Sequence, residues 1–189
     1  MPNWCENTLT IHHKDPAMMK KVIDAWNSGH FFQSLHPCPQ ELYDTTAGYS
    51  ADEEKQKARE AKEVANIEKY GYKNWYDWCL GNWGTKWDID TEGIKIKQTD
   101  GFSESFYSAW SPPVELYEYL KEQGYEINAL YYESGMGFCG NWTSSQGDDY
   151  HQIENYNAKW IEENIPKMLV SEFNLLANDE DDEDDDIAE

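Results

Sequence analysis

The first thirty residues change from the hydrophobic period of a strand to that of a helix. From Thr8 to Ile11 apolar and polar side chains alternate, which is the pattern of a strand with one buried face. Asp15 and Pro16 then supply an N-cap and a first-turn proline, and apolar residues recur at helical spacing until Gly29. A strand followed by an amphipathic helix predicts helices packed on one face of a sheet.

The later elements favour one α+β architecture. Strands are predicted, in chain order, over Lys86–Asp90, Ile94–Gln98, Glu104–Trp110, Tyr125–Glu133 and a short final stretch that ends at Thr143. A helix between the third and fourth of these strands opens at Pro112-Pro113 and closes at Gly124. The order is that of a ferredoxin-like split βαβ sandwich with an antiparallel sheet, which we predict for residues 1–150.

A helical insertion at about residues 50–82 interrupts this order. The residues before it, 31–46, contain two prolines and are expected to be irregular. Ser50 is the predicted cap of a helix from Ala51 to about Tyr70, whose thin apolar stripe indicates a solvated surface helix. A short aromatic helix then follows from Asn74.

The C-terminal part is expected to add one helix and a tail. Residues 151–177 carry apolar side chains at helical spacing and predict an amphipathic helix packed on the domain. Pro166 lies inside this pattern and should kink or split the helix. Residues 178–189 are too charged to be buried and are expected to be disordered.

The chain is strongly acidic. Asp and Glu number 37 against 15 Lys and Arg, which gives a formal net charge of −22. Such a surface repels phosphate backbones and anionic lipid and attracts basic proteins, so nucleic acid and membranes are disfavoured as partners. Maintaining solubility is the other role that this acidity would serve. The tail contributes an unbroken acidic run as a candidate interaction element: Asp179, Glu180, Asp181, Asp182, Glu183, Asp184, Asp185 and Asp186.

The sequence contains no recognisable catalytic or metal-binding pattern. The four Cys lie far apart without a Cys-x-x-Cys pair, which argues against structural zinc. His12 and His13 are consecutive, so on a strand they point to opposite faces and cannot chelate together. The glycine-rich stretches lack the Gly-Lys-Ser/Thr ending of a phosphate-binding loop. We therefore predict no enzyme, no cofactor and no metal site.

Two further absences predict a cytoplasmic protein. No run of about 18 apolar residues exists that would span a membrane. The first residues also lack the basic and then apolar regions of a secretory signal.

Aromatic residues are the second compositional feature, with nine Trp and thirteen Tyr. A Trp-rich scaffold that fixes the strand connections is one interpretation. The other is a shared pocket, because apolar walls with a few convergent polar groups are typical of ligand sites. The residues of the predicted pocket, with Asn82 and Lys86 as polar handles, are Asn82, Trp83, Lys86, Trp87, Trp110 and Phe138.

Five Trp- and Gly-containing blocks also carry a family resemblance. They are MPNWCENTLTI (residues 1–11), WYDW (75–78), NWGTKWD (82–88), AWSPP (109–113) and ESGMGFCG (133–140). In this order they resemble the phage- and plasmid-borne family whose ferredoxin-like domain is named after the plasmid protein YubB. The resemblance implies the fold and a mobile-element setting, in particular a bacteriophage genome, but no activity.

Two functions remain open. The first is a non-enzymatic accessory protein that binds a basic surface of a host, defence or phage protein, as an inhibitor or a competitor of DNA. The alternative is binding of a small molecule, nucleotide or single-stranded nucleic acid on the aromatic sheet or pocket. Stacking residues for the alternative would be Trp4, Tyr107, Tyr131 and Tyr132, and its cationic cluster Lys86, Lys95 and Lys97.

Overall fold

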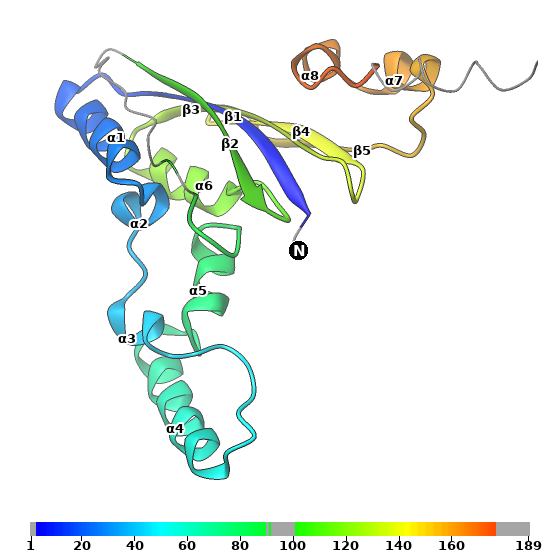
Figure 1. Cartoon of the computed structure of the whole chain (residues 1–189). Helices are drawn as coiled ribbons and strands as arrows, with labels where there is room; N and C mark the ends of the chain where they lie inside the picture. Colours follow the sequence, from blue (N-terminus) through cyan, green and yellow to red (C-terminus); the bar gives the residue numbers. More distant parts are fainter. Residues whose placement is uncertain (1–2, 90, 92–100, 177–189) are drawn as a thin grey trace, which may run out of the picture.

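The computed structural model describes residues 3–89, 91 and 101–176, and these form an α+β fold around one open sheet (Figure 1). The sheet is antiparallel, with the strand order β2-β1-β3-β4-β5. The strands are β1 (Trp4–His12), β2 (Phe102–Ala109), β3 (Glu126–Glu133), β4 (Phe138–Thr143) and β5 (Gly147–Gln152). The helices are α1 (Pro16–Ser28), α2 (Phe31–Leu35), α3 (Gln40–Tyr43), α4 (Glu53–Tyr70), α5 (Trp75–Asn82), α6 (Val114–Glu122), α7 (Ala158–Asn164) and α8 (Lys167–Glu172).

The central strand gives the sheet its ferredoxin-like connectivity. β1 pairs antiparallel with both β2 and β3, and Leu9 lies between Glu104 and Ala129 in this register. β2 and β3 therefore run in the same direction, and α6 connects them across β1. This is a split βαβ unit, and it confirms the predicted fold class.

The main core lies between one face of the sheet and helices α1, α2 and α6 (Figure 1). Trp26 of α1 is at its centre, in edge contact with Phe31, Phe102 and Phe106. The local signals that place α1 there are the predicted ones, since Asp15 accepts a hydrogen bond from the Ala17 N–H and the helix ends at a left-handed Gly29.

The C-terminal helices cover only part of the opposite face. Leu130 of β3 and Cys139 of β4 pack there against Ile161 of α7 and Leu169 of α8. The helices are separated at Ile165-Pro166, as expected for a proline without a backbone N–H. Because α7 and α8 pack over β3 and β4, the open face of β1 and β2 stays accessible, and Trp4 and Tyr107 are exposed on it.

Helix α4 projects away from the sheet, and α5 leads the chain back toward it (Figure 1). The N-cap of α4 is Asp52 and not the expected Ser50. The Asp52 carboxylate accepts hydrogen bonds from the N–H groups of Glu54 and Lys55. Buried Asn66 joins α4 to the chain on either side by donating to Thr45 Oγ1 at 3.0 Å and to the Lys73 carbonyl at 2.8 Å.

Three local predictions differ from the structure. Residues 31–46 contain the short helices α2 and α3 on either side of the two prolines. Residues 86–89 of the predicted strand Lys86–Asp90 are irregular, because Asp88 turns toward α2 and accepts from its backbone. Strand β5 was not predicted, since its sequence GDDYHQ has almost no apolar alternation. The predicted strand Ile94–Gln98 and the acidic tail lie outside the described residues.

Within the described ranges, the chain has no helix whose length and apolar character would let it cross a membrane.

Candidate functional site

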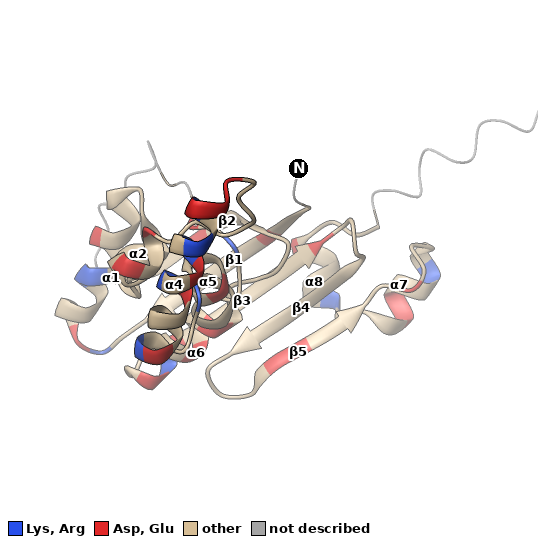
Figure 2. Cartoon of the chain, turned by 90° about the horizontal axis from the view of Figure 1, so that it is seen from below, with Lys and Arg blue, Asp and Glu red and all other residues tan. Residues whose placement is uncertain are grey.

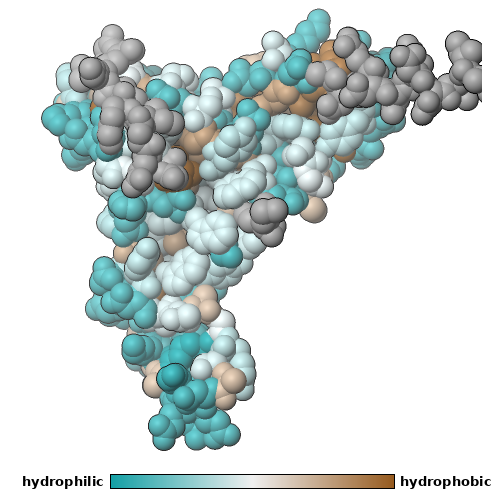
Figure 3. Space-filling model, in the orientation of Figure 1, coloured by the Kyte–Doolittle hydropathy of each residue, from teal (hydrophilic) through white to brown (hydrophobic). Residues whose placement is uncertain are grey.

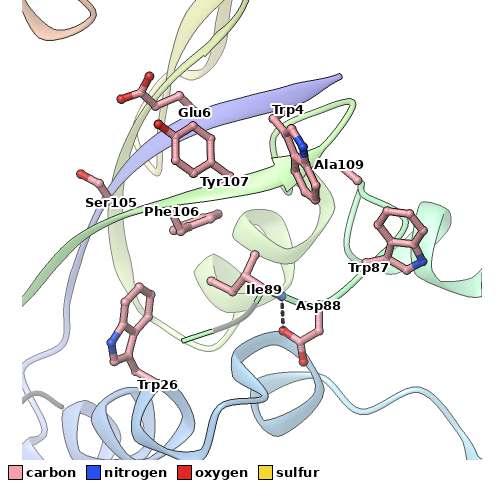
Figure 4. Close-up of a pocket in the computed structure, with 10 residues that line it drawn as sticks. All are labelled: Trp4, Glu6, Trp26, Trp87, Asp88, Ile89, Ser105, Phe106, Tyr107 and Ala109. Carbon is pink, nitrogen blue, oxygen red and sulfur yellow. Dashed lines mark hydrogen bonds between the residues drawn. The ribbon is translucent and has the colours of Figure 1, made fainter. Parts of the chain in front are cut away.

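A pocket of about 630 Å³ opens beside the edge strand β2 (Figure 4). Its walls come from three parts of the chain: strands β1 and β2, helix α1, and the segment that follows α5. The lining residues are Trp4, Glu6, Trp26, Trp87, Asp88, Ile89, Ser105, Phe106, Tyr107 and Ala109. Five of these ten side chains are aromatic, so the pocket offers flat apolar surfaces with a few polar groups.

The strand register places Trp4, Glu6 and Tyr107 on one accessible face, whereas Phe106 of β2 points to the core face and contacts Trp26 there. Trp4 is opposite Ala109, and Glu6 is opposite Tyr107. Side chains of a strand alternate between faces, so Trp4, Glu6 and Tyr107 share the face that the C-terminal helices leave open. Both rings are exposed and available for contact with a ligand.

Asp88 fixes the wall that lies across from the strands. Its two carboxylate oxygens accept hydrogen bonds from the backbone N–H groups of Phe32 at 2.8 Å and Gln33 at 3.0 Å, in the first turn of α2. Burial raises the pKa of Asp88 above its ordinary value, and these N–H donors oppose that shift. Asp88 therefore holds the neighbouring Trp87 in place, and both also line a second pocket of about 360 Å³.

Lys86 lines the second pocket and lies in a cage of aromatic rings. Its Nζ atom is 4.3 Å from the ring centroid of Trp87, 4.9 Å from that of Trp110 and 5.7 Å from that of Tyr76. Within the described ranges, no carboxylate lies within ion-pair distance of this lysine. The rings thus attract the ammonium group in place of an acid. Because three rings already surround its ammonium group, Lys86 is less available to bind a small anion.

The structure does not gather the six predicted pocket residues into one cavity. Lys86, Trp87 and Trp110 are together in the cage, whereas Trp83 is a core residue whose indole N–H donates to the His36 carbonyl at 2.8 Å. Trp83 nevertheless forms part of the wall of the second pocket with Lys86 and Trp87.

The remaining two predicted pocket residues lie elsewhere. The Asn82 side chain donates to the Trp78 carbonyl and is 3.4 Å from His36 Nε2. Phe138 is on β4, where it contacts Tyr131 and Tyr150. The structure thus places Trp83, Lys86 and Trp87 around the second pocket and Asn82 and Phe138 outside its described lining, and a ligand role for any of them stays a prediction.

The four residues that were predicted to stack on bases also lie in different places. Trp4 and Tyr107 are exposed on the open face, but Tyr131 is buried on the other face and donates to Asp148 Oδ1 at 2.7 Å. Tyr132 packs against Phe173, next to α8. The sequence reasoning missed Trp26, Phe106 and Asp88 as pocket residues, since only the tertiary packing brings α1, β2 and the loop after α5 together.

The charged side chains that the described strands bring to the site are carboxylates. None of the five described strands contains Lys or Arg, so the blue segments in Figure 2 belong to helices and loops. The charged groups that line the first pocket are two carboxylates, Glu6 and Asp88. A nucleic-acid backbone needs cations to neutralise its phosphates, so this arrangement favours a cationic ligand.

The surface around the pocket differs from that of α4. Figure 3 shows pale, ring-shaped side chains extending from the sheet down toward α5, whereas the projecting α4 is mostly teal. Among the described residues, no group of three or more His, Cys, Asp or Glu could hold a metal ion.

We predict that His36 makes the stability of the fold depend on pH. Its ring stacks on Tyr119 with 3.6 Å between centroids, and burial lowers the pKa of His36 from 6.5. A lowered folded-state pKa means that stability is fully present above the unfolded pKa and is lost as pH falls through both values. We expect urea unfolding to show lower stability at pH 5.5 than at pH 7.5, and His36→Phe to reduce that decline.

The control for this experiment is His12→Gln, which removes an exposed histidine from β1 and should keep the wild-type decline. An unchanged decline in His36→Phe would show that His36 is not the titrating group.

Comparisons with known proteins give one structural similarity. Neither the family models nor the curated proteins that we searched match the chain. The crystal structure of the protein api92 from Yersinia pseudotuberculosis, family DUF1281, superposes with a TM-score of 0.38 and 11% identity, over 82% of this chain and 99% of that one. Such a score does not establish a shared fold, so the fold rests on the strand order and packing above. Membership of the YubB-type family stays a prediction.

Proposed function

We propose that the chain is a protein-binding module that takes a basic segment of a partner protein into the aromatic pocket beside β2. The observation that carries this proposal is the combination of five aromatic side chains and two carboxylates in one pocket, with no Lys or Arg among its described lining residues. Arg and Lys side chains bind to such surfaces through their apolar stems and through cation–π attraction, which contributes about 0.5–2 kcal/mol per contact.

The overall charge supports the same kind of partner. A net charge of −22 attracts basic surfaces over long range and accelerates their encounter with the pocket. In the mobile-element setting that the family resemblance implies, the partner would be a cytoplasmic host, defence or phage protein, and binding would inhibit it or compete with DNA for it.

The test is affinity purification from bacterial lysate with the full chain. We expect the wild type to capture one protein in stoichiometric amount at 50 mM NaCl, less of it at 500 mM, and the Trp4→Ala/Tyr107→Ala variant to capture at least about tenfold less. Tyr150→Ala is the matched control, because Tyr150 on β5 and Trp4 are both 51% exposed but Tyr150 is not in the pocket.

Capture alone does not support the proposal, so the purified partner is then titrated against the same variants. Equal affinity of the wild type and the pocket variant, or binding that is unchanged in 500 mM NaCl, would contradict it.

Single-stranded nucleic acid is the second candidate for the same surface. It is favoured by the exposed rings of Trp4 and Tyr107, since bases stack on such rings. The absence of Lys and Arg from the described strands speaks against it. A titration with oligothymidine at 150 mM NaCl separates the two candidates: tight binding that Trp4→Ala removes would favour nucleic acid over a basic protein.

A further inference from the structure

A third pocket, of different chemistry, lies on the projecting helix α4 and the loop before it. It has a volume of about 440 Å³ and is formed by the loop 44–50 and one face of α4. Lys55, Arg59 and Lys62 line it, and their spacing of four and three residues places them on the same side of the helix. The only acidic side chain among its described lining residues is Asp44.

The three cations are not fully neutralised by their neighbours. Lys55 is 3.8 Å from Asp52 in an exposed pair, and no carboxylate in the described part of the chain lies within ion-pair distance of Lys62. Arg59 is the most buried of them, with 17% of its side chain exposed. Its Nε is 3.3 Å from Glu63, but this contact lacks hydrogen-bond geometry, and the Nε–H has no other partner. A partly buried guanidinium that lines a cavity is suited to bind a ligand anion.

The loop adds further donors to the same cavity. It is fixed at both ends, since Thr45 Oγ1 donates to the Glu41 carbonyl at 2.7 Å and the Ser50 N–H donates to Gln56 Oε1 at 3.0 Å. Between these anchors, the backbone N–H groups of residues 46–49 meet no acceptor in the described protein. Gly48 has a φ of +117°, a conformation that only glycine adopts readily. The pocket is thus lined by this loop, which carries four hydroxyl groups on Thr45, Thr46, Tyr49 and Ser50, and by three cations of α4.

We infer that this pocket binds the phosphate group of a nucleotide-like small molecule. Arg59 would bind two phosphate oxygens with its planar guanidinium, while Lys62 and Lys55 add charge. Tyr49 also lines the pocket and is highly exposed, so its ring is free to stack on a base or a similar flat group. This site is independent of the basic-segment pocket beside β2 and would bind a ligand of opposite charge.

The test is isothermal titration calorimetry of the full chain at 150 mM NaCl, with pyrophosphate, ADP and adenosine as probes. We expect pyrophosphate and ADP to bind and adenosine, which lacks phosphate, not to bind. Arg59→Gln should weaken both ligands by at least about tenfold, the loss expected for a charged hydrogen-bonding partner. Tyr49→Ala should weaken ADP by at least about threefold and leave pyrophosphate unchanged.

Lys57→Gln is the matched control, because it removes one positive charge from α4 but lies outside the pocket. Circular dichroism checks that each variant keeps the helix. Absence of binding by pyrophosphate and ADP at millimolar concentration, or an equal loss in Lys57→Gln and Arg59→Gln, would overturn the inference. Equal weakening of both ligands by Tyr49→Ala would overturn the stacking role of this residue.

Discussion

Replacing Trp83 with alanine is expected to lower the free energy of unfolding by about 3–5 kcal/mol, the range for removing a large buried aromatic side chain. Trp83 is 3% exposed. Its ring packs against Trp78 and Phe32 at centroid distances of 5.6 and 5.7 Å, and its indole N–H donates to the His36 carbonyl. The variant loses these contacts and leaves the His36 carbonyl without its donor. Urea unfolding followed by circular dichroism measures the loss.

Trp87→Ala is the control that separates a core tryptophan from a pocket tryptophan. Trp87 is four residues away in the same sequence block, but 39% of it is exposed. We expect its replacement to cost about 1–1.5 kcal/mol of stability and to weaken capture of the partner protein. A stability loss in Trp83→Ala no larger than that in Trp87→Ala would contradict this division of roles.

Gly140→Ala is expected to destabilise the fold by about 1–3 kcal/mol, because a methyl group has no room at this point of β4. An added Cβ would collide with the hydroxyl of Tyr131 and lie 2.8 Å from the backbone oxygen of Asp149 on β5. Tyr131 would have to move, and its 2.7 Å hydrogen bond to Asp148 would be lost. The measurement is again the free energy of unfolding in urea.

Gly101→Ala is the matched control for this prediction. A Cβ at Gly101 meets no atom of the described residues within 4 Å, and its φ lies outside the left-handed region. The substitution should therefore leave stability within about 1 kcal/mol of the wild type or raise it slightly, since alanine restricts the unfolded chain. Similar effects of the two substitutions would show that the close packing around Tyr131 is not rigid.

The two proposed sites lie on different parts of the fold and are therefore separable. The aromatic pocket is built on the sheet, whereas the cationic pocket is built on the projecting helix α4 and the loop before it (Figure 1). The aromatic pocket favours a cationic ligand and the cationic pocket an anionic one. Added salt weakens binding at both sites, so probes of opposite charge are needed to distinguish them. A failure of the phosphate titration would leave the protein-binding proposal untouched.

Elements with strong local signals could be predicted from the sequence. The alternation around Leu9, the Asp15-Pro16 start of α1 and its Gly29 end all act within a few residues, and the structure contains β1 and α1 where they indicate. The same holds for α6 after Pro113 and for β3. The order of these elements was sufficient to predict a split βαβ sheet, because short connections and a buried apolar face allow few other arrangements.

Only the tertiary structure decided which side chains are buried in the core and which line a pocket. Trp83 and Trp87 are equivalent in sequence pattern, yet packing buries Trp83 and leaves Trp87 39% exposed in the wall of the aromatic pocket. The residues that complete the pocket, Trp26 and Phe106, come from elements far apart in the chain. The cationic pocket also needed the fold, because the loop 44–50 folds against α4 through contacts that no local pattern encodes. Local propensity and periodicity thus determined the elements, whereas long-range packing determined the sites.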